Sequence, residues 1–262
     1  MRKIFLALSF LLGSLLLIAT TPESSTRLKG TILYNRTAPL PKTLPVSRDR
    51  AACGEAISDE AVRIHKKGGL QNVIIIIANI AAEKLPPLAL NLEIKACRFQ
   101  PRVLALGAGS EVTIRNGDAV LHDVKARWQP FANGWNETST LNIFGDATET
   151  AFSFAFPQKN LRAQQKLEKP GLLQLRSDLG HDWMNGYILV MPHRYFAVTN
   201  AEGKFELPAL PAGRYDLVLW HETLGAKRQI VEAKTADKNA LLIKWFPDDS
   251  TTANHADSAA TN

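Results

Sequence analysis

The chain has 262 residues and a formal net charge of +6, from 31 lysines and arginines against 25 aspartates and glutamates. A composition that is 45% hydrophobic and 21% charged is ordinary for a globular protein and argues against long disordered tracts. The basic residues are scattered and form no block that could follow a phosphate backbone, so we expect no nucleic-acid partner. With only two cysteines, the chain cannot form a disulfide-dense scaffold or an all-cysteine metal site.

The first residues have the pattern of a signal peptide. Arg2 and Lys3 precede an uncharged run over residues 4–19, which small and polar residues follow. This order predicts a secretory signal peptide over residues 1–22 and a periplasmic or secreted protein. The alternative is an uncleaved anchor, which would hold the chain at a membrane, although the apolar run is short for a membrane span.

Export makes a disulfide the expected state of the two cysteines, Cys53 and Cys97. Disulfides persist in oxidising compartments, and closing a loop of this size stabilises a fold by roughly 4 kcal/mol in the chain-entropy model. The alternative is a pair of buried free thiols.

Short strands account for most of the chain after residue 27. The run Val73–Ile77 is β-branched and suits a strand buried on both faces, whereas Phe152, Phe154 and Phe156 alternate with small residues. Glycine and Asn-Gly-Asp turns separate these segments, and no long helical period is present. The pattern predicts an all-β protein of sandwiches or barrels, followed by a disordered tail over residues 247–262.

Breaks near residues 81–87 and 191–192 divide this set of strands. The pieces 27–80 and 191–246 are each too short to form a sandwich comfortably. We therefore expect them to form one discontinuous sandwich, with a second β domain over 81–190 inserted between them.

The C-terminal piece contains a distinctive pattern over residues 199–217. It predicts a hairpin that turns at Glu202-Gly203, then a tight Pro-Ala-Gly turn at residues 211–213 into the next strand. The side chains that alternate along these strands are expected to point into the core: Phe205, Leu207, Tyr215 and Leu217. This pattern resembles the carboxypeptidase regulatory-like domain, a transthyretin-like sandwich related to carbohydrate-binding folds. Residues 28–32 and 73–77 resemble other strands of that family. The resemblance implies no catalytic residues.

The middle stretch contains two histidines and a methionine in a suggestive order. His122 follows an Asn-Gly-Asp turn at the start of a strand, and His181 and Met184 lie three residues apart in a later loop between strands. This arrangement resembles the cupredoxin family, whose copper is held by a histidine on one strand and by a cysteine, a histidine and a methionine on one loop. The resemblance implies a cupredoxin-like sandwich or barrel with His122, His181 and Met184 as copper ligands.

Ser177 stands where the family has its cysteine. A serine hydroxyl stays protonated at neutral pH and cannot replace a soft thiolate, so the thiolate position is vacant. We therefore expect a degenerate copper site in a redox accessory protein that works with a redox partner, and not an ordinary blue-copper electron carrier.

A metal-free interpretation stays open beside this one. His122 would then be a turn histidine, and Met184 would pack against Trp183 to close one end of the barrel. The protein would bind an envelope glycan or a partner protein through exposed aromatic residues, for which the candidates are Trp128, Trp135 and Trp245.

The remaining histidines are weaker candidates. His193 and His221 flank strands of the discontinuous sandwich, where they either meet at a second metal site or form separate hydrogen bonds to the backbone. His65 and His255 are expected in solvent. The sequence has no nucleophile elbow, phosphate-binding loop or His-Glu-x-x-His motif, so we expect no enzyme.

Overall fold

The computed structural model describes residues 25–35, 37, 39–40, 42–136, 143–234 and 240–245. Almost every element in these ranges is a strand, which confirms the all-β fold class. The single helix of the described residues is the short α1 (Arg50–Cys53), and none of them forms a helix long and apolar enough to span a membrane. The predicted signal peptide (1–22), the predicted tail (247–262) and His255 lie outside the described residues.

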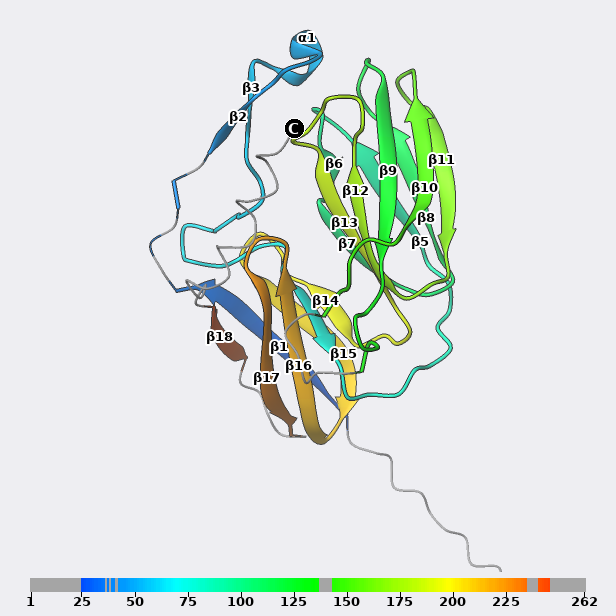
Figure 1. The fold of residues 1–262 in the computed structure, drawn as a ribbon. Helices are drawn as coiled ribbons and strands as arrows, with labels where there is room; N and C mark the ends of the chain where they lie inside the picture. Colours follow the sequence, from blue (N-terminus) through cyan, green and yellow to red (C-terminus); the bar gives the residue numbers. More distant parts are fainter. Residues whose placement is uncertain are drawn as a thin grey trace, which may run out of the picture.

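Two β sandwiches lie one above the other in Figure 1. In the upper one, here called the central sandwich, a five-stranded sheet of order β10-β9-β12-β13-β7 faces a four-stranded sheet of order β11-β8-β5-β6. Its strands are β5 (Ala89–Ile94), β6 (Phe99–Gln100), β7 (Val103–Gly107), β8 (Ser110–Asn116), β9 (His122–Gln129), β10 (Glu149–Phe156), β11 (Arg162–Leu167), β12 (Gly171–Arg176) and β13 (Asn185–Met191).

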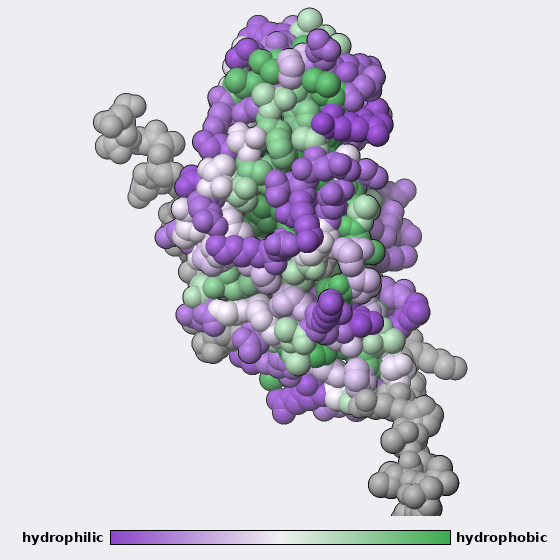
Figure 2. Space-filling view, turned by 90° about the vertical axis from the view of Figure 1, so that its right-hand side faces the viewer, coloured by the Kyte–Doolittle hydropathy of each residue, from purple (hydrophilic) through white to green (hydrophobic). Residues whose placement is uncertain are grey.

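The edge strand β10 shows how the phenylalanine alternation is used. Phe152 and Phe156 are buried and Phe154 is partly buried, and the rings of Phe152 and Phe154 stack with centroids 5.2 Å apart. The predicted alternation is therefore present, with the aromatic side chains on the core face of the strand. Figure 2 shows apolar surface on the upper part of the face that carries the edge strands β10 and β11.

The lower sandwich, here called the terminal sandwich, is built from both ends of the described chain. A three-stranded sheet of order β15-β1-β18 faces a four-stranded sheet of order β14-β4-β16-β17, so the chain leaves after β4 and returns at β14. The domain boundaries predicted at residues 80–81 and 190–191 stay a prediction. The strands are β1 (Ser25–Tyr34), β4 (Ile74–Ile77), β14 (Phe196–Val198), β15 (Lys204–Pro211), β16 (Gly213–His221), β17 (Gly225–Ala233) and β18 (Leu241–Trp245).

Strands β15 and β16 pack as their alternation predicts. Their four expected inward residues are buried in the terminal core: Phe205, Leu207, Tyr215 and Leu217. The predicted hairpin at Glu202-Gly203 is wrong, because the strands on either side of this turn belong to different sheets: β14 pairs with β4, and β15 pairs with β1. The preceding turn needs Gly203, whose φ is 74° and where a Cβ would lie 2.6 Å from the carbonyl oxygen of Ile32.

The isoleucine run of β4 joins the two sandwiches. Ile75 and Ile77 lie in the terminal core, whereas Ile74 and Ile76 face an apolar cluster that includes Leu189 of β13. A strand buried on both faces has no need of polar alternation, which explains the continuous β-branched sequence. The two sandwiches therefore share a buried interface.

Residues 43–58, here called the crossing segment, leave the terminal sandwich and lie against the central one (Figure 1). The segment contains β2 (Thr43–Pro45), α1 and β3 (Ala56–Ser58), and its Val46 and Ile57 are buried in the central core. A disulfide between Cys53 and Cys97, with a Cα–Cα distance of 5.4 Å, fastens it there. The predicted disulfide is thus confirmed, while these residues, expected within the terminal piece 27–80, pack elsewhere because two apolar side chains and a covalent bond hold them.

Candidate metal centre

The structure brings the two predicted histidine ligands together. His122 is the first residue of β9, and strand alternation turns it inward with Val124 and Ala126. His181 comes from the loop between β12 and β13. Both side chains are fully buried, and their ring centroids are 5.0 Å apart.

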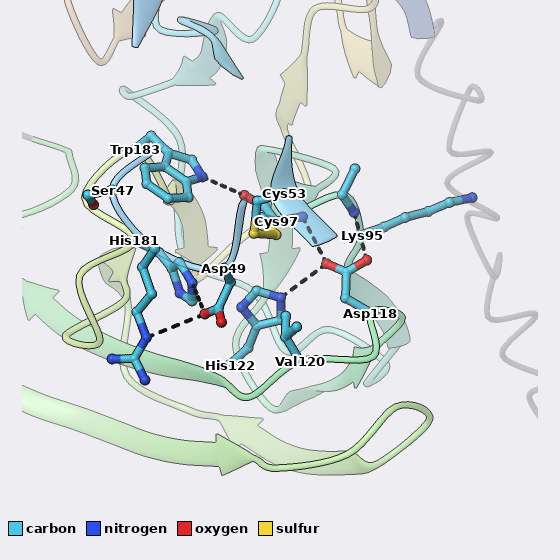
Figure 3. The surroundings of a disulfide bond; sticks show 12 residues. Ser47, Asp49, Cys53, Lys95, Cys97, Asp118, Val120, His122, His181 and Trp183 are labelled. Atoms are coloured by element: carbon cyan, nitrogen blue, oxygen red, sulfur yellow. Dashed lines mark hydrogen bonds and ion pairs between the residues drawn. A yellow bond between two sulfur atoms is a disulfide. The ribbon is translucent and has the colours of Figure 1, made fainter. Parts of the chain in front are cut away.

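Each imidazole is held by a carboxylate on one side only. The Nε2 atom of His122 lies 3.0 Å from Oδ2 of Asp118, and the Nε2 atom of His181 lies 3.0 Å from Oδ2 of Asp49 (Figure 3). A carboxylate accepts hydrogen bonds, so each Nε2 carries the hydrogen and each Nδ1 keeps a lone pair.

Both Nδ1 atoms are buried without a hydrogen-bond partner. Buried polar atoms rarely lack a partner, and each exception calls for an explanation. An imidazole that donates one N–H to a carboxylate and keeps its other nitrogen free is the usual arrangement of a metal-ligating histidine. The two histidines therefore fit a metal ion that takes nitrogen ligands.

The surroundings favour the neutral imidazole that a metal needs. Burial lowers the pKa of His122, the hydrogen bond that its Nε2 donates to Asp118 opposes this shift, and the nearby His181 lowers the pKa further. A neutral His122 at pH 7 leaves its Nδ1 lone pair available without proton release. The second imidazole, that of His181, packs edge-on against the ring of Trp183, with the two ring centroids 5.3 Å apart.

Asp118 is positioned by the loop between β8 and β9. The buried Asn116 donates to the carbonyl oxygens of Val120 and Phe156, and its Oδ1 accepts from the backbone N–H of Asp118. Gly117 fits against β5, where a Cβ would lie 2.9 Å from the carbonyl oxygen of Ile94. The Asn-Gly-Asp pattern predicted a turn, and the ligand-orienting role of its aspartate was missed.

Asp49 reaches the site from the crossing segment. Arg48 donates to the carbonyl oxygen of Leu179, and Ser47 donates to that of Gly180, so the segment is hydrogen-bonded to the same loop that carries His181. Sequence reasoning missed Asp49, because it lies far from both histidines in the chain. The one available signal was its closeness to Cys53.

The other two residues of the predicted site have contacts of a different kind. The buried Met184 donates its backbone N–H to the carbonyl oxygen of His181, and it lines a small cavity with Asp59 and Arg98 that neither metal-site histidine lines. The hydroxyl of Ser177 donates to Asp123, whose side chain leaves β9 on the face opposite His122. Met184 as a ligand and Ser177 as the vacant thiolate position stay predictions.

His193 and His221 have separate surroundings. The Nδ1 atom of His193 accepts from the backbone N–H of Tyr195, and the Nδ1 atom of His221 accepts from that of Thr223. The two rings make no contact with each other in the described part of the chain, and His193 instead meets Trp135 at a centroid distance of 5.0 Å. This matches the second alternative above, hydrogen bonds to backbone. His65 is partly exposed.

One of the three proposed exposed aromatic residues is buried. Trp245 is 2% exposed in the terminal core, so its predicted exposure is wrong, because β18 turns this residue inward. Trp128 and Trp135 are partly exposed, and the Nζ of Lys169 lies 3.4 Å from the centroid of the Trp128 ring.

No family profile and no curated protein matches this chain. Among solved structures, a copper-containing nitrite reductase from Thermus scotoductus is 21% identical over 44% of this chain, with a TM-score of 0.28. A purple cupredoxin from Nitrosopumilus maritimus is 18% identical over 38% of this chain and 97% of its own, with a TM-score of 0.26. An auracyanin from Roseiflexus castenholzii is 13% identical over 40% of this chain and 97% of its own, with a TM-score of 0.29.

The match spans 25% of the nitrite reductase chain. Part of this chain is thus similar to solved structures that include cupredoxins. The resemblance of residues 199–217 to the carboxypeptidase regulatory-like domain stays a prediction.

Proposed function

We propose that this chain is an exported, non-enzymatic, cupredoxin-like protein that binds copper through Nδ1 of His122 and Nδ1 of His181. The observation that carries the proposal is the pair of buried, carboxylate-oriented imidazoles whose Nδ1 atoms have no other partner. Imidazole nitrogens suit copper, and the thioether of Met184 would favour Cu(I) if it completes the set.

The same site favours an accessory role over fast electron transfer. The hydroxyl of Ser177 is engaged with Asp123, and Cys97 is engaged in the disulfide, so no thiolate is offered to the ion in this state. Copper, when bound, would supply one-electron redox chemistry or be cargo for a partner protein. Asp118 and Asp49 orient the two imidazoles, and burial excludes water from them.

Export is supported by two features. The N-terminal pattern of Arg2, Lys3 and an apolar run is typical of a signal peptide, and the Cys53–Cys97 disulfide fits an oxidising compartment. We therefore place the protein in the periplasm or outside the cell.

A copper titration of the folded, disulfide-intact protein tests the proposal. We expect one equivalent of copper to bind, and His122→Ala or His181→Ala to weaken binding by about tenfold or more, since each removes a ligand. His193→Ala is the matched control, because His193 is equally buried but lies elsewhere. Absence of stoichiometric binding, or equal losses in all three variants, would overturn the proposal.

The alternative is a metal-free module that binds a glycan or a protein. Because Trp245 is buried, this alternative depends on Trp128 and Trp135. The Nζ of Lys169 already lies over the face of the Trp128 ring. The metal-free alternative leaves the two unpartnered Nδ1 atoms unexplained, so the geometry favours copper.

A further inference from the structure

The disulfide adjoins the histidine pair. The Sγ atom of Cys97, a carboxylate oxygen of Asp118 and a ring nitrogen of His122 all lie within 4.8 Å of one another. Figure 3 shows the two sulfur atoms above the His122 ring, with Asp118 beside them. While the disulfide is intact the sulfur is no anion, and only a thiolate is a strong metal ligand.

We propose that reduction of the Cys53–Cys97 bond creates a second form of the metal site, in which the Cys97 thiolate joins His122 to bind Cu(I) while Asp118 keeps its hydrogen bonds to the His122 ring and the Cys97 N–H. The inference rests on the proposed function in sharing His122, but it adds a ligand and a redox condition. Thiolate is the ligand type that Cu(I) prefers, so the reduced protein binds Cu(I) more tightly than the oxidised protein.

The backbone holds Cys97 in place without the help of the disulfide. Lys95 and Arg98 exchange backbone hydrogen bonds of 2.9 and 3.2 Å, and Ala96 and Cys97 between them have φ values of 50° and 54°. This is a two-residue turn of type I′ between β5 and β6. Asp118 accepts from the N–H groups of both central residues, at 2.9 and 2.8 Å, so the turn and His122 share one carboxylate.

Cys53 has the opposite character. It lies on α1, a helix of four residues with none buried, and its own side chain is partly exposed, whereas Cys97 is fully buried. A reductant therefore reaches the sulfur of Cys53 first. The sulfur that departs is that of Cys97, next to His122.

The reaction is a thiol–disulfide exchange with a dithiol reductant. One thiolate of the reductant attacks Sγ of Cys53, the Cys53–Cys97 bond breaks, and its electron pair stays on Cys97 as a thiolate. The second thiol of the reductant then attacks the mixed disulfide and releases Cys53 as a thiol. The reductant leaves as a disulfide, two electrons have passed to the protein, and Cu(I) binds the Cys97 thiolate in place of a proton.

Two single variants provide a matched test. Cys53→Ser and Cys97→Ser both abolish the disulfide, but only Cys53→Ser keeps the Cys97 sulfur, which the turn between β5 and β6 holds beside His122. Cu(I) affinity is measured without oxygen, by competition with a chromophoric Cu(I) chelator. We expect Cys53→Ser to bind Cu(I) about tenfold or more tightly than both Cys97→Ser and the oxidised wild type. Equal affinity of the two variants would overturn the proposal.

A second measurement avoids dependence on either variant folding. Wild-type protein is reduced with a phosphine, freed of it, and titrated with Cd(II), which does not oxidise thiols. Ultraviolet thiolate-to-metal absorption is expected from this protein and is lost in reduced His122→Ala carrying the same two thiols. Absence of the absorption, or its persistence unchanged in the variant, contradicts the inference.

The oxidised wild type separates this inference from the proposed function. If it binds copper through His122 and His181 and reduction adds nothing, the inference fails and the proposed function stands. If only the reduced protein or Cys53→Ser binds copper, the proposed function fails for the oxidised state and the inference stands.

Discussion

At the scale of single residues, the candidate site depends on which nitrogen of each imidazole carries the hydrogen. Asp118 and Asp49 accept from Nε2, and this choice leaves Nδ1 of both rings free. Removing a carboxylate that orients a ligating histidine typically lowers metal affinity by roughly 10–100-fold, although the carboxylate does not touch the ion.

Asp49→Gly removes one orienting carboxylate without straining the backbone, because φ is 54° at this residue and glycine adopts that value freely. We expect copper affinity to fall by roughly 10–100-fold, since His181 then loses its fixed orientation. Asp49→Asn is the control, because its amide oxygen still accepts from Nε2 and asparagine tolerates the same φ. The same chelator competition measures both, and equal losses in the two variants would show that the acceptor is irrelevant.

The two histidines outside the site make stability depend on pH. Burial lowers the pKa of His193 to about 4 and that of His221 to about 3, with Arg102 adding to the effect at His221, against 6.5 as the ordinary value. Below pH 6.5 these two histidines bind more protons in the unfolded chain than in the folded protein. The contribution of the neutral, buried histidines to the free energy of unfolding is therefore complete above pH 6.5 and is lost as the pH falls toward 3.

Thermal unfolding between pH 7 and pH 4 checks this pH dependence. We expect Tm to fall with pH in the wild type and to fall less steeply in His221→Asn, which cannot be protonated in that range. Parallel curves for the two proteins would exclude His221 as a source of the acid sensitivity.

The histidine pair was predictable from the sequence, but its aspartates were not. His122 and His181 were singled out because two histidines and a methionine stood in a recognisable order around strands. Asp49 and Asp118 look like any solvated acidic residue until the fold places them. Geometry, and not residue type, gives them their role.

At the scale of elements, the turn between β5 and β6 is the most unusual piece of backbone near the site. Two consecutive residues with positive φ are commonly asparagine and glycine, whereas here they are Ala96 and Cys97. Such strain is kept where the surrounding structure fixes it, and here Asp118 does so by accepting hydrogen bonds from both central residues.

Ala96→Gly is therefore expected to stabilise the protein. Glycine relieves the positive φ at this residue, and the gain should be about 0.5–1 kcal/mol in the free energy of unfolding. Urea unfolding of the oxidised protein measures it. Ala163→Gly, on strand β11, is the control and should destabilise, because glycine weakens a strand interior. A loss of stability in Ala96→Gly contradicts this explanation of the turn.

The existence and burial of the strands followed from the sequence more readily than the route of the crossing segment. The isoleucine run and the alternation along β15 and β16 predicted buried strands, because side-chain periodicity reports directly on the faces of a strand. Residues 43–58 offered no such period, since β2 and β3 have three residues each. Their position depends on Val46, Ile57 and the disulfide, which are long-range contacts.

At the scale of the whole molecule, the two sandwiches are joined by an apolar interface that includes one buried ion pair. Arg102 of the central sandwich meets Glu222 of the terminal one through two hydrogen bonds of 2.6 and 2.7 Å, and their side chains are 10% and 7% exposed. Burial raises the pKa of Glu222, and the hydrogen bond from Arg102 opposes that shift. The pair thus links one defined point of each sandwich, and removing its two charges from water costs free energy.

Breaking this pair from one side should be far worse than replacing both partners. Glu222→Ala leaves the Arg102 guanidinium buried without a counter-charge and is expected to lower the free energy of unfolding by about 3–5 kcal/mol. Arg102→Met combined with Glu222→Leu should be nearly neutral, since no buried charge remains. Denaturant unfolding compares the three proteins, and a double variant as unstable as the single one would contradict the argument.

The central claim is that His122 and His181 each donate from Nε2 to an aspartate and receive the metal at Nδ1. Nitrogen-15 NMR of histidine-labelled, disulfide-intact protein at neutral pH, before and after one equivalent of Cu(I), tests it most directly. We predict Nε2–H tautomers for both residues in the metal-free protein, and a large shift of their two Nδ1 resonances on addition of copper, with those of His193 and His221 unmoved. Nδ1–H tautomers, or Nδ1 resonances of His122 and His181 that copper does not shift, would contradict the account.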